Sequence, residues 1–340
     1  RIANLVFGTP AIYGAGGAGD IATIRTENLV WSGGSGPGAV ITGGAGTGSG
    51  SLVIDAERVS FGYGPKVQVS GVDAAARLAL GFASVNLNAS DRITANHRGS
   101  LAVYQSQGPY VPGEGYRYTG GDLNISTPLL TGEAGSFNSI TAGGAIRVTA
   151  PEGAKAGTVT GANGLGAELA LNGEAVSIAS AITLPSGRLT ITAAGDILLA
   201  DAAMLDLAGR EVRFDDVKKY SWGGEVVLES RDGDIRQSAG STIELSARNN
   251  HAGRLMAAAL GVDAGLVDLR GTVLGSSSGE YDAGGTVVPY RGGFIDVRAQ
   301  HLGESGTLSE QFSTLNERLN SGGMFGGRGF QIKQGDLAIG

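Results

Sequence analysis

The chain has 340 residues, a formal net charge of −7 and no cysteine, so disulfides, thiolate metal sites and cysteine nucleophiles are excluded. Glycine accounts for 60 residues, about 18% where proteins average about 7%, without the triplet period of collagen. The acidic balance disfavours nucleic acid as a partner, because binding phosphate needs a basic face. No apolar run approaches the roughly 20 residues that span a membrane, so we expect no membrane insertion.

A glycine followed by alternating apolar residues recurs along the chain. An early copy is Gly50 with Leu52 and Ile54, and a later one is Gly187 with Leu189. Alternation over four or five residues predicts a short strand with one buried face. The copies begin at Gly50, Gly99, Gly121, Gly144, Gly187, Gly224, Gly265 and Gly293.

The spacing of these strands favours a stack of similar coils. The first apolar position recurs at intervals of 22, 23, 23 and 20 residues through Leu101, Leu123, Ile146, Leu169 and Leu189. A propeller repeat would be longer, and a leucine-rich repeat would show its own consensus, which leaves a β-sandwich as the other competitor. We therefore predict an all-β fold, a parallel β-helix or β-solenoid, over residues 1–300.

Two longer units show the internal plan of a coil. The unit 187–207 aligns with the unit 224–245, so that Ile197 corresponds to Ile235 and Leu205 to Ile243. Each unit carries three short strands separated by turns. Because one coil cannot bury its own apolar residues, equivalent residues of successive coils are expected to stack about 4.8 Å apart.

Three segments interrupt the repeat, at residues 104–118, 213–222 and 279–291. They concentrate aromatic residues in a chain that is only 6% aromatic. Such rings offer a carbohydrate or protein partner contact area at low entropic cost, although they could instead only pack each loop against the solenoid. The candidate ligand-binding residues are Tyr104, Tyr110, Tyr116, Tyr118, Tyr220 and Trp222.

The segment 301–340 changes character. Thr307 and Glu310 form the pattern of a capping box, and Leu308, Phe312, Leu315 and Leu319 fall on one helical face. We predict a short helix over about 308–319 that flanks or caps the solenoid, ended by the glycines that follow.

No motif indicates a cofactor or a metal ion. Gly14, Gly16 and Gly19 match a dinucleotide fingerprint, but the residues that follow predict a strand where the fingerprint needs a helix. The three histidines lack the spacing of metal ligands. We therefore expect no cofactor and no metal site.

Carboxylates are the remaining candidates for chemistry. Asp201, Asp206, Asp215 and Asp232 would come together if stacked coils aligned them, and enzymes of the β-helix class that cleave polysaccharides use such clusters. Outward Asp and Glu residues of strands are more commonly a solvated face. We expect no catalytic residue and keep a polysaccharide-active enzyme as the alternative.

The strings at residues 50–59, 143–150 and 187–197 resemble those of filamentous haemagglutinin-like exoproteins of two-partner secretion systems. The resemblance runs over roughly residues 50–297. It implies a right-handed parallel β-helix, secretion to the bacterial cell surface through an outer-membrane partner, and a role in adhesion or competition. The Asn-Pro-Asn motifs of that family's secretion domain are missing, so the resemblance is to a shaft or carboxy-terminal region.

The chain opens without the pattern of an export signal, which is expected of a piece of a longer protein. Taken together, these observations predict a non-catalytic structural or adhesive segment of a secreted bacterial surface exoprotein. Its partners would be host-cell, matrix or glycan ligands, and the secretion partner would contact a region outside this fragment. A scaffold that presents a carboxy-terminal toxin is a further alternative.

Overall fold

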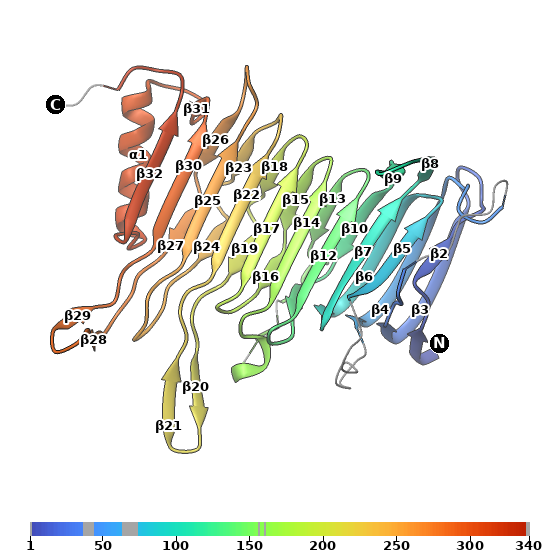
Figure 1. Cartoon of the computed structure of the whole chain (residues 1–340), viewed down its shortest axis with the longest axis horizontal. Helices are drawn as coiled ribbons and strands as arrows, with labels where there is room; N and C mark the ends of the chain where they lie inside the picture. Colours follow the sequence, from blue (N-terminus) through green and yellow to red (C-terminus); the bar gives the residue numbers. More distant parts are fainter. Residues whose placement is uncertain (1, 37–43, 63–73, 156, 160, 338–340) are drawn as a thin grey trace. The chain divides into compact units, whose positions relative to one another are not determined.

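The computed structural model describes residues 2–36, 44–62, 74–155, 157–159 and 161–337. Strands dominate these residues, and the strands of the two large sheets pair in parallel (Figure 1). The predicted all-β parallel β-helix is therefore confirmed. The chain divides into two compact units, of which unit 1 comprises Arg1–Gly157 and Leu169–Ser180 and unit 2 comprises Thr158–Glu168 and Ala181–Gly340.

Unit 1 contains long strands near its amino terminus and shorter ones beyond them. In the first sheet, β10, β13 and β15 stack on the first half of β6, while β11 pairs with its second half; β5, β7 and β12 belong to the second sheet. The bounds are β1 (Ile2–Phe7), β2 (Ala11–Tyr13), β3 (Ile21–Trp31), β4 (Gly50–Phe61), β5 (Ala75–Leu80), β6 (Phe82–Ala95), β7 (Arg98–Tyr104), β8 (Ser106–Val111), β9 (Gly115–Thr119), β10 (Asp122–Ser126), β11 (Leu129–Gly132), β12 (Phe137–Ala142), β13 (Ile146–Thr149), β14 (Glu168–Gly173) and β15 (Val176–Ala179).

Unit 2 has three stacked columns of short strands, so each complete coil contributes one strand to each column. The columns are β17, β22, β25, β30 and β32; β18, β23, β26 and β31; and β16, β19, β24 and β27. The bounds are η1 (Gly161–Gly164), β16 (Ala181–Thr183), β17 (Arg188–Ala193), β18 (Ile197–Leu199), β19 (Met204–Asp206), β20 (Glu211–Phe214), β21 (Val217–Tyr220), β22 (Glu225–Ser230), β23 (Ile235–Gln237), β24 (Thr242–Glu244), β25 (Arg254–Ala259), β26 (Leu266–Leu269), β27 (Thr272–Leu274), β28 (Glu280–Asp282), β29 (Val287–Pro289), β30 (Phe294–Ala299), β31 (His301–Leu302) and β32 (Gly327–Ile332).

The core of unit 2 consists of aliphatic ladders, one inside each column. The predicted alignment of the two longer units is confirmed, because Ile197 pairs with Ile235 and Leu205 with Ile243. All four side chains are fully buried. In the first column the buried ladder runs through Leu189, Val226, Leu255 and Ile295.

The single series of spacings predicted for the earlier coils combines two different sheets. Leu123 pairs with Ile146 in the first sheet, as expected. Leu101 lies in β7 of the second sheet and pairs with Ile140, not with Leu123. The error arose because the segment 104–118 is inserted between β7 and β10, and its length resembles that of a coil.

Glycines form the corner before the first column of unit 2. The amide of Arg254 donates to the carbonyl of Gly224 (3.0 Å), and the amide of Glu225 donates to that of Gly187 (2.9 Å). A Cβ atom on Gly253 would lie 2.0 Å from the Gly224 oxygen, and one on Gly224 would lie 2.4 Å from the Gly187 oxygen. Successive coils therefore approach this corner too closely for any side chain.

The predicted helix is present as α1 (Leu308–Ser321), two residues longer than expected. Both halves of the capping box form, because Thr307 accepts from the Glu310 amide and the Glu310 side chain accepts from the Thr307 amide. Leu315 and Leu319 are buried, and α1 contacts β27 and β31. Among the described residues, no helix has the length and apolar character that crossing a membrane requires.

Replacing Gly253 with alanine is expected to destabilise the protein by about 1–3 kcal/mol, because the new methyl group overlaps the Gly224 carbonyl. Urea unfolding followed by circular dichroism measures the change. The control is Gly8→Ala, where the nearest atom to the added Cβ is the Ser32 hydroxyl at 4.0 Å. Identical unfolding curves for Gly253→Ala and the wild type would show that the corner can accommodate a Cβ atom.

Candidate functional site

The first insertion, in unit 1, folds as the antiparallel hairpin β8–β9. Tyr110 and Tyr116 pair across it, with ring centroids 5.2 Å apart in an edge-to-face arrangement. Their side chains are 60% and 41% exposed. The structure thus brings two of the predicted tyrosines together with free ring surface near the turn of the hairpin.

The base of the same hairpin is a stacked pair of tyrosines. The rings of Tyr104 and Tyr118 lie 4.7 Å apart at an angle of 19°. Burial raises the pKa of both hydroxyls, and the Gln107 amide, 3.4 Å from the Tyr118 oxygen, opposes the shift of Tyr118. Tyr104 and Tyr118 therefore anchor the hairpin as neutral, half-buried rings.

The second insertion, in unit 2, folds as the hairpin β20–β21. The guanidinium of Arg248 lies over the Tyr220 ring (5.6 Å), and the Asn250 amide donates to the Tyr220 carbonyl (2.8 Å). Trp222 follows the hairpin and is 59% exposed. Of these two predicted residues, Tyr220 packs against its surroundings while Trp222 presents an open indole face.

The third insertion contains the hairpin β28–β29, whose rings pack on one another while Tyr281 stays 36% exposed. Tyr281 and Tyr290 stack on each other (4.9 Å), and both meet His251 edge to face. His251 accepts a hydrogen bond from the amide of Arg291 at Nδ1 (3.0 Å). These contacts fix the hairpin to the neighbouring loop, which is the packing role that aromatic residues can take in such insertions.

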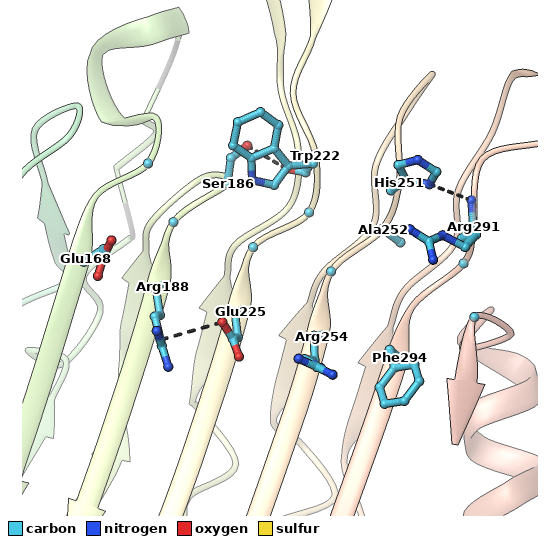
Figure 2. A pocket seen from close by; sticks show the side chains of 17 residues that line it. Glu168, Ser186, Arg188, Trp222, Glu225, His251, Ala252, Arg254, Arg291 and Phe294 are labelled. Carbon is cyan, nitrogen blue, oxygen red and sulfur yellow. Dashed lines mark hydrogen bonds and ion pairs between the residues drawn. The ribbon is translucent and has the colours of Figure 1, made fainter. Parts of the chain in front are cut away.

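A groove of about 650 Å³ lies beside the glycine corner of unit 2 (Figure 2). It is bounded by the loops that end the second and third insertions, at Trp222 and Arg291, and by the loop that carries His251. The Ser186 hydroxyl donates to the carbonyl of Trp222 (2.6 Å) and holds this part of the wall. Ser186 itself adopts a left-handed backbone (φ 54°).

The floor of the groove is a row of outward side chains at the first position of successive strands (Figure 2). Arg188 pairs with Glu225, Glu225 with Arg254, and Arg254 with Phe294 in the strand register. Arg188 and Glu225 also form an ion pair at 3.7 Å, and the Arg254 guanidinium lies over the Phe294 ring at 5.0 Å. The row therefore alternates in charge and ends on an aromatic ring.

Sequence reasoning missed these floor residues, although a signal for them exists. Each follows a corner glycine directly, as in Gly187 with Arg188 and Gly253 with Arg254. An alignment of the repeats on that glycine would have shown a variable outward position stacked from coil to coil. Trp222 lies in an aromatic insertion, whereas Arg188 and Arg254 lie outside the three insertions.

The four aspartates considered for catalysis are not brought together. Asp201 lies in the turn between β18 and β19, Asp206 ends β19, Asp215 lies in the turn of the β20–β21 hairpin, and Asp232 lies in the turn before β23. Two of them have structural partners. Asp201 accepts from the Gly240 amide (2.9 Å), and Asp206 pairs with Arg210 (2.6 Å). Stacking of the coils does not align these four residues, because they lie at different places along the coil.

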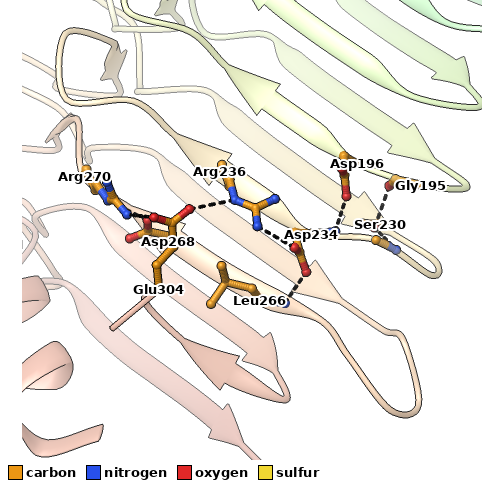
Figure 3. Close-up of polar contacts among 10 residues, drawn as sticks. Gly195, Asp196, Ser230, Asp234, Arg236, Leu266, Asp268, Arg270 and Glu304 are labelled. Atoms are coloured by element: carbon orange, nitrogen blue, oxygen red, sulfur yellow. Dashed lines mark hydrogen bonds and ion pairs between the residues drawn. The ribbon is translucent and has the colours of Figure 1, made fainter. Parts of the chain in front are cut away.

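A second set of charged residues covers the middle column of unit 2 (Figure 3). Asp196 accepts from the Asp234 amide, and Asp234 accepts from the Leu266 amide, both at 2.8 Å. Each carboxylate thus receives a backbone N–H from the next coil. These aspartates join neighbouring coils and are already engaged.

The loop after β31 is tied to the same face by Glu304, which accepts from Arg236 (3.0 Å) and from Arg270 (Figure 3). Hydrogen bonds from these two guanidiniums hold the pKa of Glu304 below its ordinary value. Burial raises the pKa of Asp268 despite its ion pair with Arg270 (2.6 Å). The Asp268 side chain is only 8% exposed, so a substrate has little access to it.

Within the described ranges, no group of three or more His, Asp and Glu residues could hold a metal ion. Comparison of the chain with protein-family models, with curated proteins and with solved structures found no match. The fold alone therefore defines the class: this is a repeat protein of the parallel β-helix class.

Replacing Glu304 with glutamine is expected to speed hydrogen exchange in residues 301–306 at pH 7, because the loop loses the charged group that binds it to Arg236 and Arg270. The folded-state pKa of Glu304 is lowered, so its stabilisation is present above the unfolded pKa and disappears as pH falls through the folded pKa. The difference between the variant and the wild type should therefore shrink below about pH 4.

Comparison at equal pH cancels the intrinsic pH dependence of exchange. Glu229→Gln is the matched control, because Glu229 is exposed and, in the part of the chain that the structure describes, has no ion-pair partner. Equal exchange of Glu304→Gln and the wild type at pH 7 would contradict the role of this ion network.

Proposed function

We propose that the chain is a non-catalytic structural and adhesive segment of a large secreted bacterial surface exoprotein. Its ligands are glycans or proteins of a cell surface or matrix, and its mechanism is passive. Stacked coils provide a stiff support, while the insertions present side chains to the ligand. The resemblance to filamentous haemagglutinin-like exoproteins supports this setting.

The proposal rests on the contrast between two pairs of tyrosines in the β8–β9 hairpin, one packed and one exposed. Its base is anchored by the Tyr104–Tyr118 stack, while Tyr110 and Tyr116 remain exposed. Exposed aromatic rings cost free energy in water, and a preorganised pair loses little entropy when a ligand covers it. An arrangement of this kind suits binding better than core packing.

Changing both Tyr110 and Tyr116 to alanine is expected to weaken binding of the chain to immobilised glycans or matrix proteins by about tenfold or more. The assay compares fluorescently labelled protein on arrays that carry host glycans, fibronectin and collagen. Phe137→Ala is the control, since Phe137 lies in the same unit, is 48% exposed and is outside the hairpin.

Unchanged binding of the double variant, with an unaltered circular dichroism spectrum, would remove this hairpin from the site. The complete absence of binding by the wild type on every surface would argue against an adhesive role. Incubation of the same protein with acidic and neutral polysaccharides separates the enzymatic alternative, because a binder releases no new reducing ends. Release of such ends would contradict the proposal.

A further inference from the structure

We propose that the groove of unit 2 is a second binding site, separate from the tyrosine hairpin, for a polysaccharide that bears carboxylates. The inference rests on the proposed function only in requiring that the protein meets glycans outside the cell. Its basis is the combination of an exposed indole with guanidiniums that have no carboxylate partner.

The charged residues that line the groove favour an anionic ligand. The groove is lined by Arg188, Arg254 and Arg291 and by two carboxylates, Glu168 and Glu225. Glu225 is within ion-pair distance of Arg188 (3.7 Å). Among the residues that the structure describes, neither Arg254 nor Arg291 has a carboxylate within 4.0 Å. Two guanidiniums without a carboxylate partner thus lie at one end of the groove, and the five charged groups of its lining sum to +1.

The strand register shows where a ligand carboxylate would continue the alternation of charge along the floor. Along the floor a guanidinium, a carboxylate and a guanidinium alternate at Arg188, Glu225 and Arg254. A ligand carboxylate beside Arg254 would repeat the pairing that Arg188 makes with Glu225. Guanidinium and carboxylate match in geometry and form strong charge-assisted hydrogen bonds, which favours this class of anion.

The aromatic residues suggest that the anion is attached to a sugar. Trp222, 59% exposed, forms part of the wall, and Phe294 ends the floor beneath the Arg254 guanidinium. The C–H face of a pyranose ring can pack on an indole, while its carboxylate reaches a neighbouring guanidinium. Trp and Arg are also the residue types that contribute most at binding hot spots.

The groove is held in place before any ligand binds. Ser186 fixes the backbone of Trp222, and the Arg291 carbonyl accepts from the Ala252 amide (3.0 Å) while its own amide donates to His251. Preorganisation lowers the entropic cost of binding. The chain as a whole carries a charge of −7, so general electrostatics repels polyanions and an affinity for one must come from a local site.

The test measures binding of the intact 340-residue chain to polygalacturonate and to the same polymer after full methyl esterification. The esterified polymer keeps the sugar rings and loses the charge. We expect the wild type to prefer polygalacturonate by about tenfold or more. Arg254→Gln/Arg291→Gln should remove that preference, and Trp222→Ala should weaken binding of both polymers.

The charge control is Arg231→Gln/Lys333→Gln, which removes the same two positive charges from exposed positions of unit 2 outside the groove. Its affinity for polygalacturonate should stay within about twofold of the wild type. An equal loss in this control, or no loss in the Arg254/Arg291 variant, would overturn the proposal. Circular dichroism checks that each variant folds.

The tyrosine variant distinguishes this inference from the proposed function. Tyr110→Ala/Tyr116→Ala should bind polygalacturonate as the wild type does. If the wild type does not bind polygalacturonate but binds matrix proteins through the hairpin, the groove is not a binding site. The proposed adhesive function would then still hold. Loss of polygalacturonate binding in the tyrosine variant alone would assign that polymer to the hairpin.

Discussion

Close stacking of successive coils is the constraint on which the structure depends. Each coil forms backbone hydrogen bonds with its neighbours and packs its apolar side chains against theirs, at a spacing of about 4.8 Å. This spacing stacks apolar residues at equivalent inward positions, as in the fully buried Val226 and Leu255. It also requires corners without side chains, and Gly224 and Gly253 meet that requirement in unit 2.

The same constraint leaves the outward positions free and sets them in rows. An outward side chain always has neighbours one coil away, so like charges there would repel at short distance. One row of unit 2 alternates in sign through Arg188, Glu225 and Arg254. Asp234 shows another use of an outward carboxylate, because it accepts an amide hydrogen from the next coil. Stacking thereby converts a variable sequence position into a continuous surface.

The sequence predicted those features that repeat with the coil. The β-helix, the pairing of Ile197 with Ile235 and the capping box of α1 follow from local patterns that tertiary contacts reinforce. The prediction was wrong where an insertion has about the length of a coil, so that Leu101 was aligned with Leu123 and not with Ile140. Pairwise contacts such as that of Arg254 with Phe294 depend on register, and the groove was therefore not predictable from the residue types alone.

The insertions escape the stacking constraint because each hairpin pairs with itself. In β8–β9 the backbone partners come from the same segment, so the turn needs no coil above or below it. Tyr110 and Tyr116 can then remain exposed without removing apolar surface from the core. Tyr281 and Tyr290 instead pack on His251, which attaches their loop to the neighbouring one. Aromatic content alone does not distinguish these two outcomes. Tyr281 and Tyr290 find an aromatic partner in His251 of a neighbouring loop, whereas Tyr110 and Tyr116 pair with each other across their own hairpin.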